Sequence, residues 1–310
     1  MLRPQFAREQ VSDLDLEERH VQNMFQALPV TASGWTDDTD ILVLFFRLTL
    51  DSATEFLFGE SVDSQLIALK GKTVDAVSTS RDEKVFAYAF DKAQDCLARG
   101  ARFGEQFRWA HNAEFRKLCK DVHDFVDYYV QRALRFDSEK PLSHDKERYV
   151  FLEALAQQTR DPVELRSQLL NILLAGRDTT ASLLSWLFML LVKHPEVFRE
   201  LRQTIIRDFG EYGTDASNIS FSSLKSCTFL QHCLNEALRL FPVVPMNSRR
   251  ALVDTTIPNG GGPDGLSPVF IPKGSEVNYS VHVMHHRADL WEDPEEFRPQ
   301  RWVGRRAGFE

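Results

Sequence analysis

An acid and a hydroxyl stand next to each other inside a long apolar segment of the chain. They are Asp178 and Thr179, in the hexapeptide Ala-Gly-Arg-Asp-Thr-Thr that begins at Ala175. Glycine in a helix costs about 1 kcal/mol relative to alanine, and a buried unpaired carboxylate is more expensive still. Residues that lower stability in this way indicate a function, and a carboxyl group beside a hydroxyl can relay protons to a bound reactant.

Two interpretations of this hexapeptide remain open. In the first, the Thr179 hydroxyl bonds back to the carbonyl of Ala175 and loosens the helix beside Gly176, which has no side chain. The resulting groove would admit a flat cofactor or a diatomic ligand. In the second, the segment is only a kinked helix, and Asp178 pairs with Arg177 or with another part of the chain.

A second group of charged residues lies further along the chain. Glu236 and Arg239 share one face of a helix, and such pairs are common on exposed helices, where they contribute little. The apolar neighbours Leu234 and Leu238 indicate that this pair is partly buried and needs further partners. Arg301, in the later segment Phe-Arg-Pro-Gln-Arg-Trp, could supply a second guanidinium to Glu236, although the segment alone also fits a surface loop.

The helix that carries Asp178 and Thr179 is marked clearly in the sequence. Asp161 is a good N-cap, Pro162 suits the first helical position, and Glu164 can close a capping box. No helix-breaking residue occurs before Pro195, so the helix is predicted over Pro162–Lys193, with a length of about 48 Å. A helix that is apolar nearly all round lies at the centre of a fold.

Helical periodicity dominates the chain up to about residue 240. Strand-like pieces follow, separated by a turn-rich stretch at 258–268, and the last stretch, 287–310, is loop-like. The sequence therefore predicts a mainly α fold with a small β part. The predicted helices are Ile41–Phe58, Glu83–Ala98, His111–Leu134, Glu147–Gln158, Pro162–Lys193, Glu196–Phe209 and Leu224–Leu240, and the predicted strands are Ala251–Ile257, Val269–Ile271 and Glu276–Val283.

Composition limits the possible partners. The 310 residues include 37 Lys and Arg against 45 Asp and Glu, a net charge of −8 that offers no footprint for nucleic acid. A local basic cluster near the end is expected to be a solvated loop. The cysteines are too few and too scattered for a disulfide scaffold or a metal site, so each is expected to be free and buried in a helix. The basic cluster is Arg298, Arg301, Arg305 and Arg306, and the cysteines are Cys96, Cys119, Cys227 and Cys233.

The start of the chain does not look like a signal peptide, and its most apolar segments do not look like simple membrane spans. Met1–Glu9 carries Arg3 and Arg8 in place of the apolar stretch of a signal peptide. The two most apolar windows, Ile41–Phe58 and Leu169–Val192, are interrupted by charges that would be costly at mid-bilayer depth.

Taken together, three pieces resemble the cytochrome P450 family in their order and spacing. They are the hexapeptide at 175–180, the Glu236 and Arg239 pair, and the segment Phe297–Trp302. About 57 residues separate Thr179 from Glu236, and a similar number separate Arg239 from Phe297.

The resemblance covers essentially the whole chain. It implies an incomplete cytochrome P450 fold, a single partial domain over 1–310, built around a long central helix. Residues 1–248 would be its helical part. Residues 249–310 would be a β part and a loop that precede the haem-binding segment.

The resemblance also implies roles for individual residues. Ala175 and Gly176 would lie against the distal face of haem, Asp178 and Thr179 would guide protons for oxygen activation, and Arg249 would meet a haem propionate.

On the proximal side, Glu236, Arg239 and Arg301 would form a structural ion network rather than take part in a chemical step. Gln300 stands where the family more often has glutamate, which bears on how that loop is anchored.

The activity implied is that of a haem-thiolate monooxygenase, with electrons from an NADPH-dependent reductase. Three stretches resemble the fungal branch that hydroxylates alkanes and fatty acids, so the expected substrate is a long apolar chain attacked near its terminus. Phe45, Phe46 and Phe58 either line the site for that substrate or belong to the ordinary core. The three stretches are Leu44–Ser61, His123–Val130 and Leu266–Gly274.

The haem-thiolate reaction depends on a cysteine thiolate bound to the iron. In the family this cysteine follows shortly after the segment that matches Trp302. All four cysteines here precede Phe297, so we expect that none of them is the axial ligand.

Leu2–Phe6 looks like the stretch that follows an early helix of the family. We therefore expect a fragment of a protein that an N-terminal anchor holds on the cytosolic face of the endoplasmic reticulum membrane. The alternative is a catalytically inactive truncated relative or a non-enzymatic helical binding protein.

Overall fold

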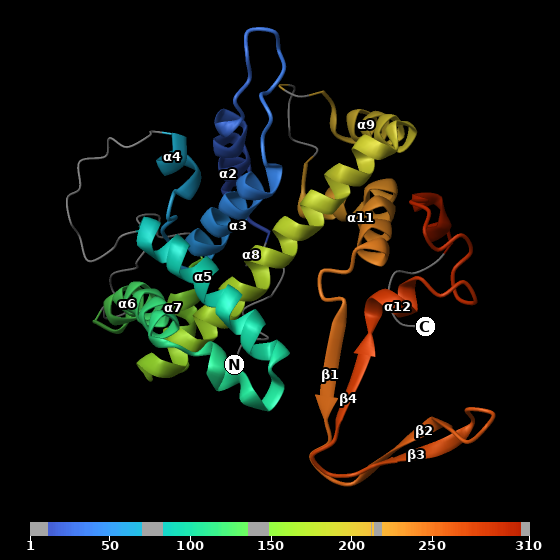
Figure 1. Ribbon diagram of the computed structural model, residues 1–310. Helices are drawn as coiled ribbons and strands as arrows, with labels where there is room; N and C mark the ends of the chain where they lie inside the picture. Colours follow the sequence, from blue (N-terminus) through green and yellow to red (C-terminus); the bar gives the residue numbers. More distant parts are fainter. Residues whose placement is uncertain (1–11, 70–82, 136–148, 212, 214–218, 305–310) are drawn as a thin grey trace. The chain divides into compact units, whose positions relative to one another are not determined.

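A computed structural model describes residues 12–69, 83–135, 149–211, 213 and 219–304 (Figure 1). The chain divides into two compact units, Met1–Ala181 and Ser182–Glu310. The boundary falls inside a long helix, α8 (Pro162–Lys193), which therefore contributes residues to both units.

The start of α8 is fixed by side-chain caps. Asp161 Oδ1 accepts hydrogen bonds from the backbone N–H groups of Val163 at 2.8 Å and Glu164 at 3.4 Å, as the sequence predicts. The Glu164 carboxylate differs from the prediction, because it accepts a hydrogen bond from the Thr159 hydroxyl at 2.7 Å. The predicted bounds of α8 are confirmed.

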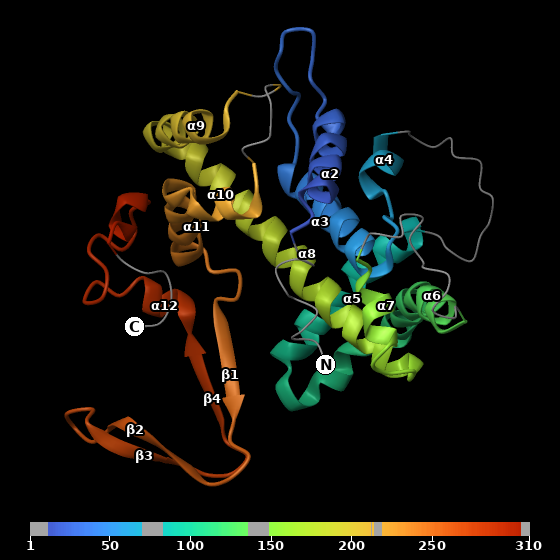
Figure 2. The same cartoon turned by 180° about the vertical axis from the view of Figure 1, so that it is seen from behind.

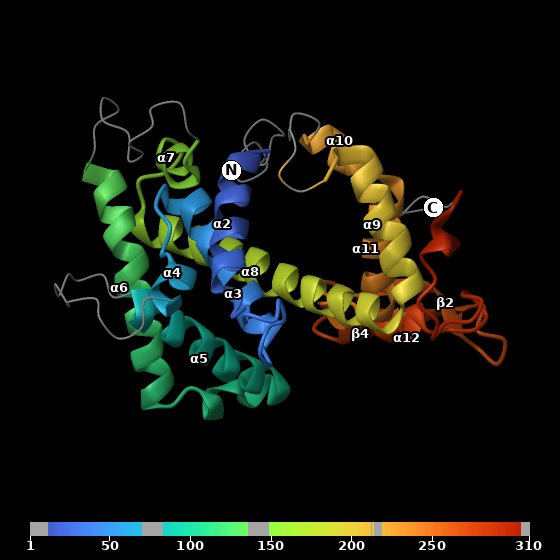
Figure 3. The same ribbon diagram turned by 90° about the horizontal axis from the view of Figure 1, so that it is seen from above.

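The first unit is entirely helical in its named elements. Figure 3 shows α5 beside α6, and these two helices pack against each other. The Phe58 ring stacks on Tyr129 at 4.5 Å between centroids, and Phe86 stacks on Phe125 at 4.0 Å. The elements are α2 (Leu14–Ala27), α3 (Ile41–Phe58), α4 (Ser64–Leu69), α5 (Glu83–Arg102), η2 (Gly104–Ala110), α6 (Ala113–Arg135), α7 (Phe151–Ala156) and the first part of α8.

Helix α3 has the bounds that the sequence predicts, and its ends explain why. Asp40 Oδ1 caps the first turn by accepting the Leu42 N–H at 3.0 Å, and Gly59 ends the helix at a φ of 78°, which glycine adopts without strain. Phe45 and Phe58 are only 2% and 1% exposed, so both are part of the buried core.

Three helical elements of the first unit are absent from the sequence prediction: α2, α4 and η2. In α2 the buried residues Leu16, His20 and Met24 recur every fourth residue, but charged side chains between them hide this stripe. The predicted helix Glu147–Gln158 is shorter, at Phe151–Ala156.

In the second unit, α9 and α11 lie beside the end of α8 (Figure 2). Their core includes Leu190 of α8, Leu201 of α9, and Ala237 of α11. The helix predicted over Leu224–Leu240 is two helices, because Cys227 has an extended ψ of 85° that interrupts the hydrogen-bond ladder. The helices are α9 (Pro195–Phe209), α10 (Phe221–Ser226), α11 (Thr228–Leu240), α12 (Val281–His285) and the short η4 (Pro299–Trp302).

The β part consists of two antiparallel pairs. Strand β1 (Met246–Arg250) pairs with β4 (Glu276–Ser280), and β2 (Thr255–Gly261) pairs with β3 (Ser267–Ile271). The β part therefore begins at Met246, three residues before the start at residue 249 that the sequence predicted. The mainly α class with a small β part is confirmed.

Two details of the β prediction are wrong. The strand predicted over Ala251–Ile257 is shifted, because β2 begins at Thr255 and continues into the turn-rich stretch as far as Gly261. A Cβ at Gly261 would meet the carbonyls of Ser267 and Pro268 at 3.0 Å, so this glycine permits close strand approach. The strand predicted to reach Val283 ends at Ser280, whose hydroxyl accepts the Val283 N–H and starts α12.

Among the described residues, no single helix combines the length and the hydropathy that a membrane crossing requires. Helices α8 and α9 meet both criteria only as a pair, and they are bent by 113° at the break between them. Arg305, Arg306 and Leu2–Phe6 lie outside the described residues.

Replacing Phe58 with alanine tests the aromatic core of the first unit. Removing a ring that is 1% exposed and stacked on Tyr129 should lower the free energy of unfolding by about 3 to 5 kcal/mol. Denaturant unfolding followed by circular dichroism measures this loss. The control W35A removes a side chain that is 78% exposed and should cost less than about 0.5 kcal/mol; similar losses for both variants would contradict the packing.

Candidate functional site

The middle of α8 is open on one face. Leu174, Ala175, Gly176 and Thr180 are exposed, although most of the helix is apolar. A Cβ added to Gly176 would meet nothing within 4 Å. Ala175 and Gly176 therefore leave part of the helix surface within the first unit without large side chains.

The Thr179 hydroxyl donates to the carbonyl of Ala175 at 2.6 Å, as the first interpretation of the hexapeptide predicts. The second interpretation is also partly correct, because Arg177 Nη1 donates to Asp178 Oδ1 at 3.1 Å. The helix runs through the hexapeptide without interruption. Ala175, Gly176, Asp178 and Thr179 thus lie within five successive positions of one helix, with Arg177 between them.

The surroundings of Asp178 raise its pKa. Burial raises its pKa, and the nearby Asp91 carboxylate raises it further, while Arg177 and a hydrogen bond from Gln94 oppose the shift. The net pKa is above the ordinary value, so the carboxyl group holds a proton at higher pH than an exposed aspartate does.

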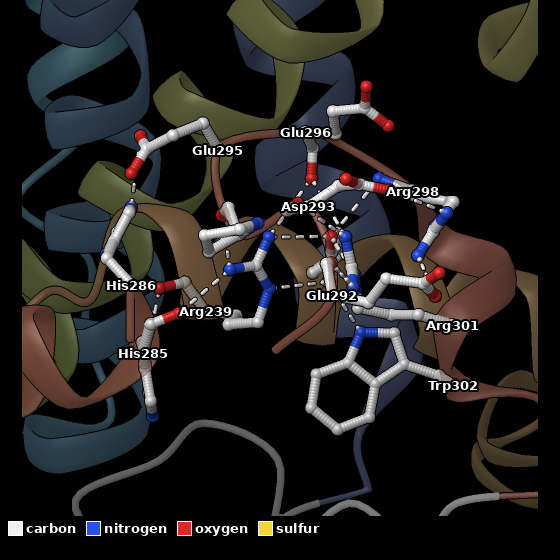
Figure 4. Close-up of polar contacts among 12 residues, drawn as sticks. Arg239, His285, His286, Glu292, Asp293, Glu295, Glu296, Arg298, Arg301 and Trp302 are labelled. Carbon is white, nitrogen blue, oxygen red and sulfur yellow. Dashed lines mark hydrogen bonds and ion pairs between the residues drawn. The ribbon is translucent and has the colours of Figure 1, made fainter. Parts of the chain in front are cut away.

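The second unit holds a fully buried carboxylate, Glu236, which is 0% exposed. Figure 4 shows the side chains of Arg239, Arg301 and Trp302, which donate to it. Glu236 receives five hydrogen bonds. Arg239 donates two, at 3.0 and 2.9 Å, and Arg301 donates one through Nε at 2.7 Å. The backbone N–H of Arg298 and the indole of Trp302 donate at 3.1 and 2.9 Å. The predicted network of Glu236, Arg239 and Arg301 is therefore present.

The two guanidinium groups also hold the loop that surrounds the carboxylate. Arg239 donates to the carbonyls of His285 at 2.9 Å, Pro294 at 2.7 Å and Glu296 at 3.0 Å. Arg301 donates to the carbonyl of Glu292 at 2.6 Å. Each arginine therefore joins one buried carboxylate to several backbone carbonyls, which fixes the path of residues 292–296.

The basic cluster near the end of the chain is not a solvated loop as a whole. The Arg301 side chain is only 5% exposed, because it belongs to the Glu236 network. The Arg298 side chain is 35% exposed and pairs with Glu292 at 2.9 Å and Asp293 at 3.3 Å.

Hydrogen bonds lower the pKa of Glu236 despite its burial. Burial alone raises this pKa, but the donors of Arg239, Arg298 and Arg301 outweigh that effect, and the net pKa lies below the ordinary value of 4.5. The carboxylate is therefore ionised at neutral pH.

Sequence reasoning missed two donors to Glu236 and the anchor of Gln300. Trp302 was a usable signal for a donor to Glu236, because an indole N–H can only donate a hydrogen bond. The Arg298 donor is a backbone N–H, which no side-chain pattern reveals. Gln300 donates to Glu200 of α9 at 3.2 Å, so an amide in this position still ties the loop to a neighbouring helix.

Arg249 lies on β1 and is exposed. Its guanidinium donates to Asn247 Oδ1 at 3.2 Å and to the Ser248 carbonyl at 2.7 Å, and it lies 5.7 Å from the centre of the Tyr279 ring. Its neighbour Arg250 instead pairs with the Glu276 carboxylate at 3.7 Å. Arg249 donates only to neutral groups in these two hydrogen bonds, so its positive charge is available to pair with a carboxylate.

All four cysteines are free, as the sequence predicts. Burial raises the pKa of Cys119 and Cys227, and it raises that of Cys233 to about 12. Cys96 is buried in α5 and accepts a hydrogen bond from Arg99 at 3.3 Å. Cys227 differs from the prediction by lying at the break between α10 and α11. These thiols pack as small apolar side chains.

Replacing Glu236 with glutamine tests the buried network. The amide keeps the shape but leaves Arg239 and Arg301 without their anion, so the free energy of unfolding should fall by about 3 to 5 kcal/mol. Denaturant unfolding measures the loss. The matched control E276Q removes a surface pairing at 3.7 Å and should cost less than about 1 kcal/mol. Equal losses at the two positions would contradict the network.

The lowered pKa of Glu236 predicts a pH dependence. A carboxylate whose pKa falls on folding stabilises the folded state above its unfolded value, and this contribution disappears as the pH drops through the native value. The stability difference between wild type and E236Q should be constant above about pH 4.5 and should shrink at lower pH. Unfolding at a series of pH values measures it. A difference that grows on acidification would contradict the assigned direction.

Comparison with known proteins agrees with this geometry. The family model of cytochrome P450 matches residues 14–308. Cytochrome P450 monooxygenase g430 of a Fusarium species is 51% identical over 100% of this chain and 55% of its own length. Cytochrome P450 52A12 of Debaryomyces hansenii is 48% identical over 97% of the chain and 58% of its own length, and cytochrome P450 52A1 of Candida tropicalis is 48% identical over 97% and 55%.

The chain thus spans little more than half the length of these curated relatives. The matched region includes both the open face of α8 and the Glu236 network, which are the two features that the residues alone single out. On this agreement of geometry, family model and close relatives, the chain belongs to the cytochrome P450 monooxygenase family.

Proposed function

We propose that the whole protein is a haem-dependent monooxygenase that inserts one oxygen atom from O2 into a long-chain alkane or fatty acid near its terminus. The observation that carries this proposal is the open face of α8. Ala175 and Gly176 are exposed there, beside a hydroxyl on Thr179 and an Asp178 carboxyl whose pKa is raised. A flat group fits against small side chains, and the two polar side chains stand next to it in sequence.

The residues present suit the distal side of haem. Ala175 and Gly176 would lie against the ring, and Arg249 would bind a propionate, because its current acceptors are neutral. Haem, when bound, supplies the redox-active iron at which O2 is activated. We propose that none of the four cysteines is the axial thiolate, since burial keeps at least Cys119, Cys227 and Cys233 protonated.

The overall reaction defines what the protein must deliver. One oxygen atom enters a C–H bond and the other leaves as water, which consumes two electrons and two protons. NADPH would supply the electrons through a reductase. Asp178 would hold a proton at its carboxyl group and Thr179 would pass protons on through its hydroxyl. Glu236, Arg239 and Arg301 would stabilise the proximal side without touching the reacting atoms.

The substrate class and the location rest on the resemblance to the fungal branch that hydroxylates alkanes and fatty acids. The stretches Leu44–Ser61, His123–Val130 and Leu266–Gly274 carry that resemblance. Apolar substrates of this kind partition into membranes, so we place the whole protein on the cytosolic face of the endoplasmic reticulum membrane, where an N-terminal anchor and a reductase would hold it.

The test uses the full-length protein with its reductase, NADPH, 18O2 and a series of alkanes and fatty acids of increasing length. The expected product carries one labelled oxygen at or next to the terminal carbon, as mass spectrometry can determine. D178N should lower product formation by about 10²-fold, because the proton donor is lost, while the haem absorbance remains.

The control D95N changes an aspartate that is 63% exposed on α5 and should keep wild-type turnover. Absence of a labelled product across the whole series would reject the proposed reaction. Labelling in the middle of the chain would reject terminal attack, and unchanged turnover in D178N would reject the role of Asp178.

A further inference from the structure

A buried cation lies next to the proposed proton donor. The Arg177 side chain is 5% exposed, although it carries a full charge. Its guanidinium carbon lies 4.8 Å from the centre of the Phe46 ring and 5.5 Å from that of Phe90. These rings belong to α3 and α5, so residues from two helices of the first unit contact one side chain of α8.

One nitrogen of Arg177 serves two carboxylates. Nη1 forms an ion pair with Asp91 of α5 and lies 3.1 Å from Asp178 Oδ1. The Asp91 side chain is 52% exposed, whereas that of Asp178 is 36% exposed. Both acids therefore lie beside the same guanidinium group, and a negative charge on Asp91 opposes the ionisation of Asp178.

The groups that face Asp178 are few and come from two helices. Burial raises its pKa most, Arg177 of α8 lowers it, Asp91 of α5 raises it, and a hydrogen bond from Gln94 of α5 lowers it. Helix α5 therefore contributes one group that favours the protonated acid and one that favours the carboxylate.

We propose that Arg177 and Asp91 are positioning residues that set the direction and the protonation state of the Asp178 carboxyl group. This inference deepens the proposed function, because it rests on Asp178 being the proton donor. Contacts with the Phe46 and Phe90 rings hold the guanidinium in its buried position. A movement of α5 that withdraws Asp91 would leave Nη1 to Asp178 alone and favour the ionised acid.

Arginine suits this place better than lysine does. A planar guanidinium can stack on aromatic rings while its edge donates to a carboxylate, whereas an ammonium is a point charge on a flexible stem. R177K should therefore keep part of the electrostatic effect on Asp178 and lose part of the fixed geometry.

The experiment measures the titration of Asp178 itself in the full-length, haem-loaded protein. Infrared absorbance of protonated carboxyl groups is recorded against pH in wild type, D91N, R177Q, R177K and D95N. Each spectrum is compared with the same background carrying D178N, so that the difference reports Asp178 alone.

In D91N the midpoint of the Asp178 titration should fall by about one pH unit, because a negative neighbour is removed and Nη1 is freed. In R177Q it should rise by about as much, and R177K should bring it back toward wild type. D95N is the matched control on α5; Asp95 pairs with Lys92 at 3.3 Å, so its loss should leave the midpoint in place.

Midpoints that stay unchanged in both D91N and R177Q would overturn the inference, as would an equal shift in D95N. D91N retains the buried arginine and loses only a half-exposed charge, so it provides the decisive reading if R177Q is poorly folded. The pH profile of product formation should shift with the midpoint. If D178N leaves product formation unchanged, the proposed function of Asp178 fails, while the infrared midpoints still decide whether Arg177 and Asp91 position it.

Discussion

The Glu236 carboxylate is fully buried, and its charge is stabilised by five hydrogen bonds. Removing a carboxylate from water costs several kcal/mol, and an isolated buried pair seldom recovers that cost. Here the two arginines each use their remaining donors on backbone carbonyls of residues 285–296. The network therefore does two things: it pairs the buried charges, and it fixes the irregular backbone of residues 285–296.

The contrast between Glu236 and Asp178 shows how the number of hydrogen-bond donors affects the pKa of a buried carboxyl group. Both carboxyl groups are partly or wholly buried, and burial raises the pKa of each. Glu236 has enough donors to reverse the effect, so it stays ionised and structural. Asp178 lies beside one guanidinium group together with Asp91, and its pKa stays above the ordinary value.

Sequence patterns predicted the parts of the structure that depend on side-chain type and periodicity. The cap at Asp161 predicted the start of α8, helical periodicity predicted the bounds of α3, and the types and order of Glu236, Arg239 and Arg301 indicated a shared network. Backbone partners such as the Arg298 N–H could not be predicted, because every residue has one. The extension of β2 to Gly261 could not be predicted, because the sequence does not show that another strand approaches this glycine closely.

The partners of Glu236 also bear on the order in which the second unit folds. Arg239 is three residues away, whereas the Arg298 N–H, Arg301 and Trp302 are 62, 65 and 66 residues away. The local pair can form as soon as α11 does, but the distant donors arrive only after the intervening chain has closed into a loop, with the loss of entropy that closure entails. Until then the half-formed cluster holds a charge that water still solvates, so desolvation and the last hydrogen bonds occur in the same late step.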